Sequence, residues 1–305
     1  MKLFQLCLMS SLLWMIAGCA APRRDEAPRR DEQLERYSTG ARSAFERGDT
    51  RQALRYFEEA LQRAYLLDNP REIGNAAYNL AAALISEGEF EQAIIRLNEA
   101  ERELMRAGDN MADVFIVQAK LSQLMGDPDR ALHYARATLQ HPQSVPTREH
   151  QLLARLIPGE LAAERGDRES AARALREAEA LVSPEDSYAS RAGVEGLRGL
   201  VDQLEHRFER AALAFDREAA LWRASERYSD MAAALERAAE AYLRAGHQNR
   251  AADRFLQAGR SSFAQGNETM ALRLLDHAYA AAQAPALRRQ IAQLSERVQA
   301  AGAGR

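Results

Sequence analysis

Cysteine is scarce in this sequence of 305 residues, and its two cysteines, Cys7 and Cys19, both lie near the N-terminus. The six histidines form no HExxH motif and have no cysteine close to them in sequence, so a zinc site has no support. No glycine-rich phosphate loop of the Walker or dinucleotide type occurs, and no serine stands in a Gly-x-Ser-x-Gly setting. We therefore predict a protein that is not an enzyme and that holds no metal and no cofactor.

Lysine is almost absent as well, because Lys2 and Lys120 are the only two and arginine supplies the other basic residues. The 41 basic and 44 acidic residues leave a net charge of −3. Proteins that bind nucleic acid usually carry a basic excess, and this composition has none, so we predict no nucleic-acid partner. The carboxylates alternate with arginines in the way that is typical of solvated helix faces.

The N-terminus has the three parts of an export signal. Lys2 supplies a positive start, residues 3–16 are apolar, and two small residues precede Cys19. The apolar stretch is too short to span a bilayer stably. The segment Ile16–Cys19, with the sequence IAGC, resembles the bacterial lipobox, and this resemblance implies that residues 1–18 are a lipoprotein signal peptide that is removed.

The same resemblance implies a lipid anchor at Cys19. In such lipoproteins this cysteine becomes the first mature residue and carries a thioether-linked diacylglycerol and an N-acyl chain. Several chains anchor firmly, because each buried CH₂ contributes about 0.8 kcal/mol and one chain alone is marginal. Removal of the signal also removes Cys7, so no intramolecular disulfide is possible. Ala20 stands where an aspartate often signals retention at the inner membrane, so the resemblance favours the periplasmic face of the outer membrane.

A duplicated hexapeptide, APRRDE, follows the cysteine at residues 21–26 and 27–32. Each copy is polar, has no net charge and contains a proline, so neither copy is expected to fold. We predict that residues 19–32 comprise the lipidated cysteine and a flexible tether.

From Asp31 onward the composition is rich in Ala, Leu, Glu, Arg and Gln, and apolar residues recur at helical spacing. Residues 75–101 have the pattern of two helices that meet at Gly88, where a helix C-terminus needs a residue that tolerates a positive φ. Glu89 and Glu91 then lie near the positive end of the second helix dipole. The sequence therefore predicts a helical hairpin here and an all-α fold throughout.

The same pattern of small residues, a turn glycine and a large residue recurs along the chain. The alanine that follows the turn stands at positions 53, 93, 131, 171, 211 and 251, which are about 40 residues apart. One copy has His206 in place of the glycine, and a further copy, around Gly266, follows after only 20 residues. The pattern resembles the tetratricopeptide repeat (TPR) in a longer form. This resemblance implies a right-handed solenoid of about seven antiparallel helix pairs.

We expect residues 33–140 to form pairs 1–3, and residues 146–300 to form pairs 4–7 with a C-terminal capping helix. His141–Pro146 interrupts the pattern and predicts a bend or joint, because proline disfavours helix in the residue before it. The helix near 248–264 should be the partner of a helix on each side. A polar helix near 286–299 should cover the exposed end of the last pair.

Two local features predict deviations from regular packing. Pro158 lies inside an otherwise helical pattern, so we expect a kink there. Gly193, Gly196 and Gly199 are spaced by three on one helix face and should permit an unusually close helix approach.

In proteins that resemble this repeat, the first helix of each pair lines a concave groove that binds peptides or partner proteins. In the hairpin at 75–101, the resemblance places Asn75, Tyr78, Asn79, Ala82 and Ile85 in that groove. Asn75 and Asn79 are four residues apart, so their amides can bond the backbone of an extended segment. The alternative is a structural role, because Tyr78 and Asn79 also match the general repeat consensus.

The next pair contains a run of four apolar residues, Val114–Val117. By the same alignment Ile116, Val117 and Lys120 face the groove, and we predict that they contact a partner. The alternative is that a continuous apolar run marks a helix that is buried on two sides.

The predicted protein is thus an outer-membrane lipoprotein that binds envelope proteins or peptide segments and touches the membrane through its lipid. It resembles repeat lipoproteins that act as pilotins for pili or secretion pores, in β-barrel assembly, or as adaptors for cell-wall enzymes. The alternative function is a ligand-binding lipoprotein that works with a solute transporter. That alternative predicts an enclosed apolar cavity between helix pairs.

Overall fold

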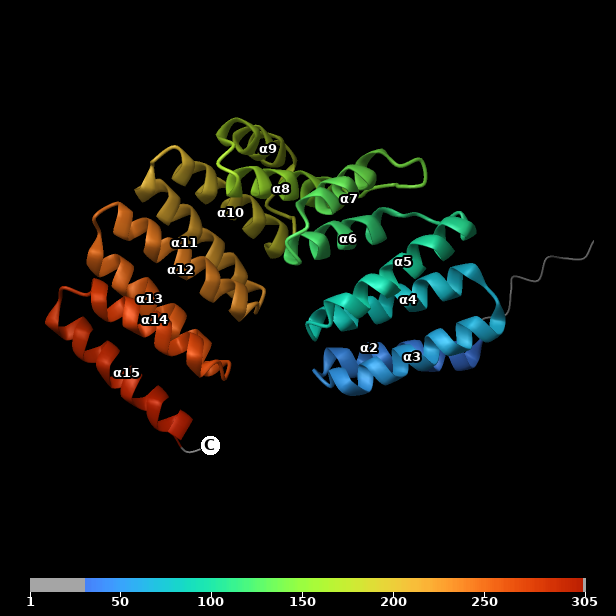
Figure 1. The fold of residues 1–305 in the computed structure, drawn as a ribbon, viewed down its shortest axis with the longest axis horizontal. Coiled ribbons are helices and arrows are strands. Elements are labelled where there is room, and N and C mark those ends of the chain that lie inside the picture. The colour runs from blue at the N-terminus through green and yellow to red at the C-terminus, as the bar shows by residue number, and fades with distance from the viewer. Residues whose placement is uncertain (1–30, 304–305) are drawn as a thin grey trace, which may run out of the picture. The chain divides into compact units, whose positions relative to one another are not determined.

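The computed structural model describes residues 31–303, and every regular element in that range is an α-helix (Figure 1). The helices follow one another as pairs, which confirms the predicted all-α fold of TPR-like helix pairs. Their bounds are α2 Glu32–Glu46, α3 Thr50–Leu67, α4 Pro70–Ser86, α5 Phe90–Ala107, α6 Ala112–Leu124, α7 Pro128–Gln140, α8 Arg148–Glu164, α9 Arg168–Leu181, α10 Tyr188–Leu204, α11 Phe208–Ala224, α12 Tyr228–Arg244, α13 Gln248–Ala264, α14 Glu268–Ala281 and α15 Pro285–Ala303.

The chain divides into two compact units, Met1–Leu67 and Asp68–Arg305. In the described part of the first unit, α2 and α3 pack together through buried Ala41, Ala53 and Phe57. These three residues belong to the repeat pattern, so the first predicted hairpin is confirmed.

Asp31 fixes the start of α2, where its carboxylate accepts a hydrogen bond from the Leu34 N–H at 2.9 Å. The Arg63 guanidinium of α3 donates to the same carboxylate at 3.0 and 2.7 Å. These contacts hold the pKa of Asp31 down at about 2, with the Arg63 hydrogen bond as the main cause. Glu32 is the first residue of α2, so the described helix begins at the last residue of the predicted tether.

In the second unit, each helix packs against the next one along the chain, and α8 also contacts α6 and α10. Helix α13 packs against both α12 and α14, which confirms the predicted double partnership. Helix α15 covers α13 and α14 and buries Ile291, Leu294 and Val298, as expected of a capping helix. Within residues 31–303, none of the helices combines the length and the apolar character that crossing a membrane requires.

The turns between helices use the left-handed backbone conformation that the sequence pattern predicts. Gly48, Gly88, Gly126 and Gly246 have φ values of 77°, 80°, 73° and 83°. His206 takes the same role with a φ of 60°, so the predicted degenerate copy of the repeat is a true helix turn. The α11–α12 turn was not among the predicted turns, and there Glu226 has a φ of 59°.

Replacing His206 with glycine is expected to raise the free energy of unfolding by about 0.5–1 kcal/mol, because an L-residue pays for the left-handed conformation that glycine adopts freely. Urea denaturation followed by circular dichroism measures the change. His206→Ala is the matched control, since alanine also removes the imidazole but keeps the strain. Equal stability of the glycine and alanine variants would show that backbone strain is absent.

The three glycines of α10 allow neighbouring helices to approach closely, as predicted. A Cβ atom added at Gly193 would lie 2.7 Å from Leu156 Cδ1, and one at Gly196 would lie 3.0 Å from Glu218 Oε1. At Gly199 it would lie 2.6 Å from Phe215 Cζ. These glycines therefore admit side chains from both α8 and α11.

The chain is non-helical between α7 and α8, where the sequence predicted an interruption. Thr147 caps α8 by accepting a hydrogen bond from the His150 N–H. Helix α8 then continues through Pro158 to Glu164. The kink at Pro158, the joint at residues 141–146 and the division of the array at that joint stay predictions.

Candidate functional site

The predicted groove residues of α4 form a partly exposed stripe on one side of the helix. Asn75 and Ala82 are exposed, whereas Tyr78, Asn79 and Ile85 are half-buried. Helix α4 starts at Pro70, which follows the N-cap Asn69. The structure thus leaves the amides of this stripe accessible from solvent, and partner binding there stays a prediction.

The opposite side of α4 packs closely against the core, so the stripe faces away from it. Gly74 is buried against α5, and a Cβ atom added to it would lie 2.5 Å from Leu104 Cγ. Ile73, Ala77 and Leu84 are buried as well. Because these residues face the core, the stripe that contains Asn75 faces outward.

Helix α6 is buried on most of its surface, in agreement with the alternative interpretation of its apolar run. Ile116 is only 7% exposed, so it contributes to packing and offers little surface to a partner. Val117 is half-buried and Lys120 is exposed. The accessible part of the predicted contact set on α6 is therefore Val117 and Lys120.

A polar contact connects α6 to α8 near their N-terminal ends, and the charge of its carboxylate also affects a tyrosine of α4. The phenol of Tyr78 in α4 has a raised pKa, mainly through burial and also through the negative charge of Asp113 in α6. The Asp113 carboxylate lies 3.0 Å from Nε2 of His150 in α8. His150 Nδ1 accepts a hydrogen bond from the Thr147 N–H at 3.2 Å, so Nε2 carries the proton of the neutral ring. The imidazole therefore donates to Asp113.

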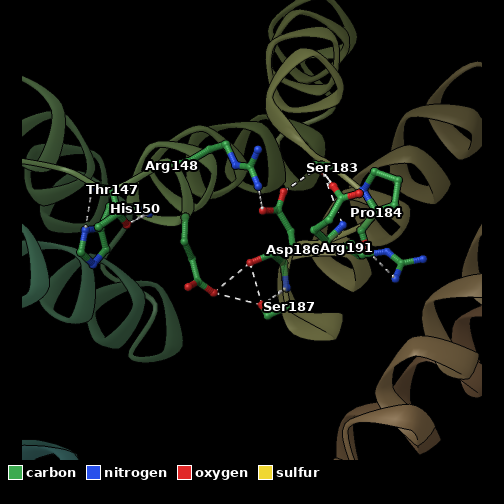
Figure 2. A network of polar contacts seen from close by, with 11 residues as sticks. Thr147, Arg148, His150, Ser183, Pro184, Asp186, Ser187 and Arg191 are labelled. Carbon is green, nitrogen blue, oxygen red and sulfur yellow. Dashed lines mark hydrogen bonds and ion pairs between the residues drawn. The ribbon is translucent and has the colours of Figure 1, made fainter.

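Figure 2 shows how the contacts continue from α8 to the start of α10. The Arg148 guanidinium pairs with Asp186 in the loop before α10. The hydroxyls of Ser187 and Ser190 each donate to Glu149 Oε1 at 3.0 Å. We call the contacts from Asp113 to Ser190 the polar ladder, and they tie α6, α8 and α10 together at one end.

A second contact joins α6 and α8 further along the helices. Lys120 Nζ lies 3.6 Å from Glu160 Oε2, and the Gln123 amide donates to the same oxygen at 2.8 Å. Lys120 is 53% exposed and Glu160 is 21% exposed, so this pair is open to solvent. An exposed pair of this kind stabilises little, which leaves Lys120 available to other acceptors.

Sequence reasoning missed these links. The members of each pair are 37 to 41 residues apart, as in Asp113–His150 and Glu149–Ser190. This separation equals one repeat. A search for residues of complementary charge or hydrogen-bonding capacity about one repeat apart is the signal that finds them.

The described residues contain no group of three His, Cys, Asp or Glu side chains placed to hold a metal ion. The second unit does have surface depressions, and they are lined by both polar and apolar residues. One of about 430 Å³ lies beside α10 and α11, and a smaller one of about 140 Å³ lies beside α12, α13 and α14. The first includes Arg191, Arg198 and Arg217, and the second includes Glu236, so neither has the wholly apolar lining that the ligand-binding alternative predicts.

The predicted signal peptide, Cys19 and nearly all of the tether lie outside the described residues. The lipid anchor therefore stays a prediction from the sequence.

Comparison with solved structures identifies the class of fold. A tetratricopeptide repeat protein from Parabacteroides merdae ATCC 43184 is 15% identical, with a TM-score of 0.52, and the match covers 87% of this chain and 100% of that one. A chain of the APC/C hetero-tetramer Cut9-Hcn1 is 19% identical, with a TM-score of 0.62, and the match covers 90% of this chain and 45% of that one. The fold is thus that of a TPR-like helical solenoid, as the sequence predicted. No known family model matches the chain, and no curated protein matches it.

Proposed function

We propose that this protein is a non-catalytic adaptor that binds extended segments of envelope proteins along the exposed sides of its first helices. The observation that carries the proposal is the outward-facing stripe of α4, in which Asn75 and Asn79 present amides four residues apart. An amide side chain both donates and accepts, so two at this spacing can bond the backbone of an extended chain. Lys120 on α6 adds a positive charge for an acidic group of the partner.

We further propose that the adaptor is a lipoprotein, held at the periplasmic face of the outer membrane by acyl chains on Cys19. This proposal is supported by the lipobox-like segment Ile16–Cys19 and by Ala20 after it. A flexible tether between lipid and solenoid would let the adaptor reach partners near the membrane surface. A role in pilus or secretion-pore assembly, in β-barrel assembly, or beside a cell-wall enzyme fits this arrangement equally.

The lysine content of the chain allows the partner face to be tested without adding a new reactive group. Lys120 is the only lysine after Lys2. An amine-reactive photo-crosslinker applied to envelopes should therefore label the folded part of the protein at Lys120. We expect crosslinked adducts with a partner, and we expect Asn75→Ala with Asn79→Ala to reduce their yield several-fold while labelling of Lys120 is unchanged.

The matched control moves the lysine to the second helix of the preceding pair. The double variant Lys120→Arg, Arg102→Lys keeps one reactive amine and places it on an exposed position of α5. We expect this variant to give no adduct that depends on the two asparagines. Equal capture from both positions, or capture that does not depend on Asn75 and Asn79, would contradict the proposed partner face.

A further inference from the structure

Glu218 of α11 is a buried carboxylate with an unusual distribution of partners. It is 4% exposed. The Arg237 guanidinium of α12 donates to Glu218 Oε1 at 2.7 Å, and the Trp222 indole N–H donates to the same oxygen at 3.1 Å. The other oxygen, Oε2, is buried and has no hydrogen-bond partner. The ionised group thus makes contacts through only half of its acceptor capacity, which is costly in a low-dielectric setting.

The absence of a side chain at Gly196 of α10 leaves room for this carboxylate. A Cβ atom added to Gly196 of α10 would lie 3.0 Å from Oε1 and 3.2 Å from Oε2 of Glu218. Any larger residue at position 196 would therefore press on the carboxylate. On the α12 side, the Arg237 guanidinium lies over the Phe215 ring, 4.9 Å from its centroid. Glu218 consequently lies where α10, α11 and α12 meet.

The charges around Glu218 oppose one another. Burial raises the pKa of Glu218 and the negative charge of Glu160 in α8 raises it further, whereas Arg237 and the Trp222 hydrogen bond lower it. Burial is the largest of these effects, so the pKa lies above its usual range. Several other charged groups on these helices have partners of their own. Glu195 and Arg198 of α10 pair with each other, Arg217 of α11 pairs with Glu195, and Glu160 of α8 pairs with Lys120 of α6.

We propose that Glu218 is a proton-controlled latch, which holds Arg237 inside the α10–α11–α12 junction when ionised and releases it toward solvent when protonated. Protonation removes the charge that attracts the guanidinium and leaves a weaker acceptor. Arg237 is already 33% exposed, so its charged end can reach water without unfolding the helix.

Release of Arg237 changes the charge of a first helix. Arg237 lies on α12 at the position that the repeat alignment makes equivalent to Asn79 on α4. Acidification would therefore free a positive charge on the side of the solenoid where we place the partner. By linkage, a partner carboxylate that pairs with Arg237 would favour protonation of Glu218 by the same free energy. The latch itself does not depend on the proposed partner binding.

Trp222 reports directly on the latch, because its indole N–H touches the titrating carboxylate. The chain has two tryptophans, Trp14 and Trp222, so Trp14→Phe leaves a single indole in the full chain. We expect the fluorescence of this variant to change in one step as the pH falls from neutral, with a midpoint above 4.5, the ordinary glutamate value. Far-UV circular dichroism at each pH should remain helical, which separates the latch from unfolding.

Three further substitutions in the same background test the assignment. Glu218→Gln keeps the volume and the acceptor for Trp222 and should abolish the fluorescence step. Arg237→Gln should move the midpoint to higher pH, since it removes the attractive charge, and Glu160→Gln should move it to lower pH, since it removes a repulsive one. A step that survives in Glu218→Gln, or midpoints that stay unchanged in the other two variants, would overturn the proposal.

Discussion

Replacing Gly199 with alanine should lower the free energy of unfolding by about 2–3 kcal/mol, although alanine is the better helix former by about 1 kcal/mol. The added Cβ atom would lie 2.6 Å from Cζ of Phe215, a ring that is fully buried. A ring in a close-packed interior can shift only a little, so we expect α10 and α11 to move apart. Urea denaturation monitored by circular dichroism measures the loss.

Gly193→Ala is the matched control, because it makes the same change on the same helix. There the new Cβ atom would meet only the end of the flexible Leu156 side chain, at 2.7 Å from Cδ1. We expect Gly193→Ala to cost clearly less than Gly199→Ala. Equal losses at the two sites would mean that loss of a helical glycine, rather than the contact with Phe215, sets the effect.

A double-mutant cycle with Phe215→Ala extends the test. Phe215→Ala alone should cost about 3–5 kcal/mol, because it leaves a cavity in a close-packed core. Combined with Gly199→Ala, the total should fall below the sum of the two single losses, since the ring that the new methyl group strikes is gone. Additive losses would show that the two residues do not constrain each other.

These expectations rest on a pattern that the sequence alone contains. Glycine recurs where a left-handed turn is needed, and alanine recurs where helices touch, so Gly88 and Ala93 predict a turn and a contact that the structure confirms. The three glycines of α10 were predictable for the same reason. Local conformation and close packing depend on residue size, and residue size can be taken directly from the sequence.

Other features depend on neighbours that are distant in sequence. The turn at Glu226 was missed because its residue gives no signal of a left-handed conformation, which the packing of α11 and α12 imposes. Glu218 has the appearance of a surface residue in a charged helix, and only the approach of α10 at Gly196 shows that it is buried. Burial of a long polar side chain is therefore decided by tertiary contacts.

The candidate partner face was partly predictable. The helical period placed Asn75 and Asn79 on one side of α4, and the structure leaves Asn75 exposed. The helical period did not distinguish the two sides of α6, because the run Val114–Val117 places apolar side chains on more than one side of that helix. The repeat alignment placed Ile116 on the partner face, but Ile116 is buried, and Lys120, four positions later, is exposed.

Replacing Cys19 with serine should remove the lipid and release the protein from the membrane fraction. Each acyl CH₂ in the membrane contributes about 0.8 kcal/mol, so loss of several chains shifts the partition toward water by many orders of magnitude. Serine cannot form the thioether that the lipobox resemblance implies. Fractionation of a bacterium with two membranes, together with the mass of the N-terminal peptide, measures both effects.

Cys7→Ser is the matched control, because Cys7 is the other cysteine of the chain and lies within the predicted signal peptide. If residues 1–18 are removed, this substitution disappears from the mature protein, and both the lipid mass and the membrane attachment should remain. The mass measurement also distinguishes a lipid anchor from an uncleaved signal, since an uncleaved chain would retain residues 1–18. A Cys19→Ser protein that is correctly cleaved and still membrane-bound would contradict the anchor and move the attachment to the folded part of the chain.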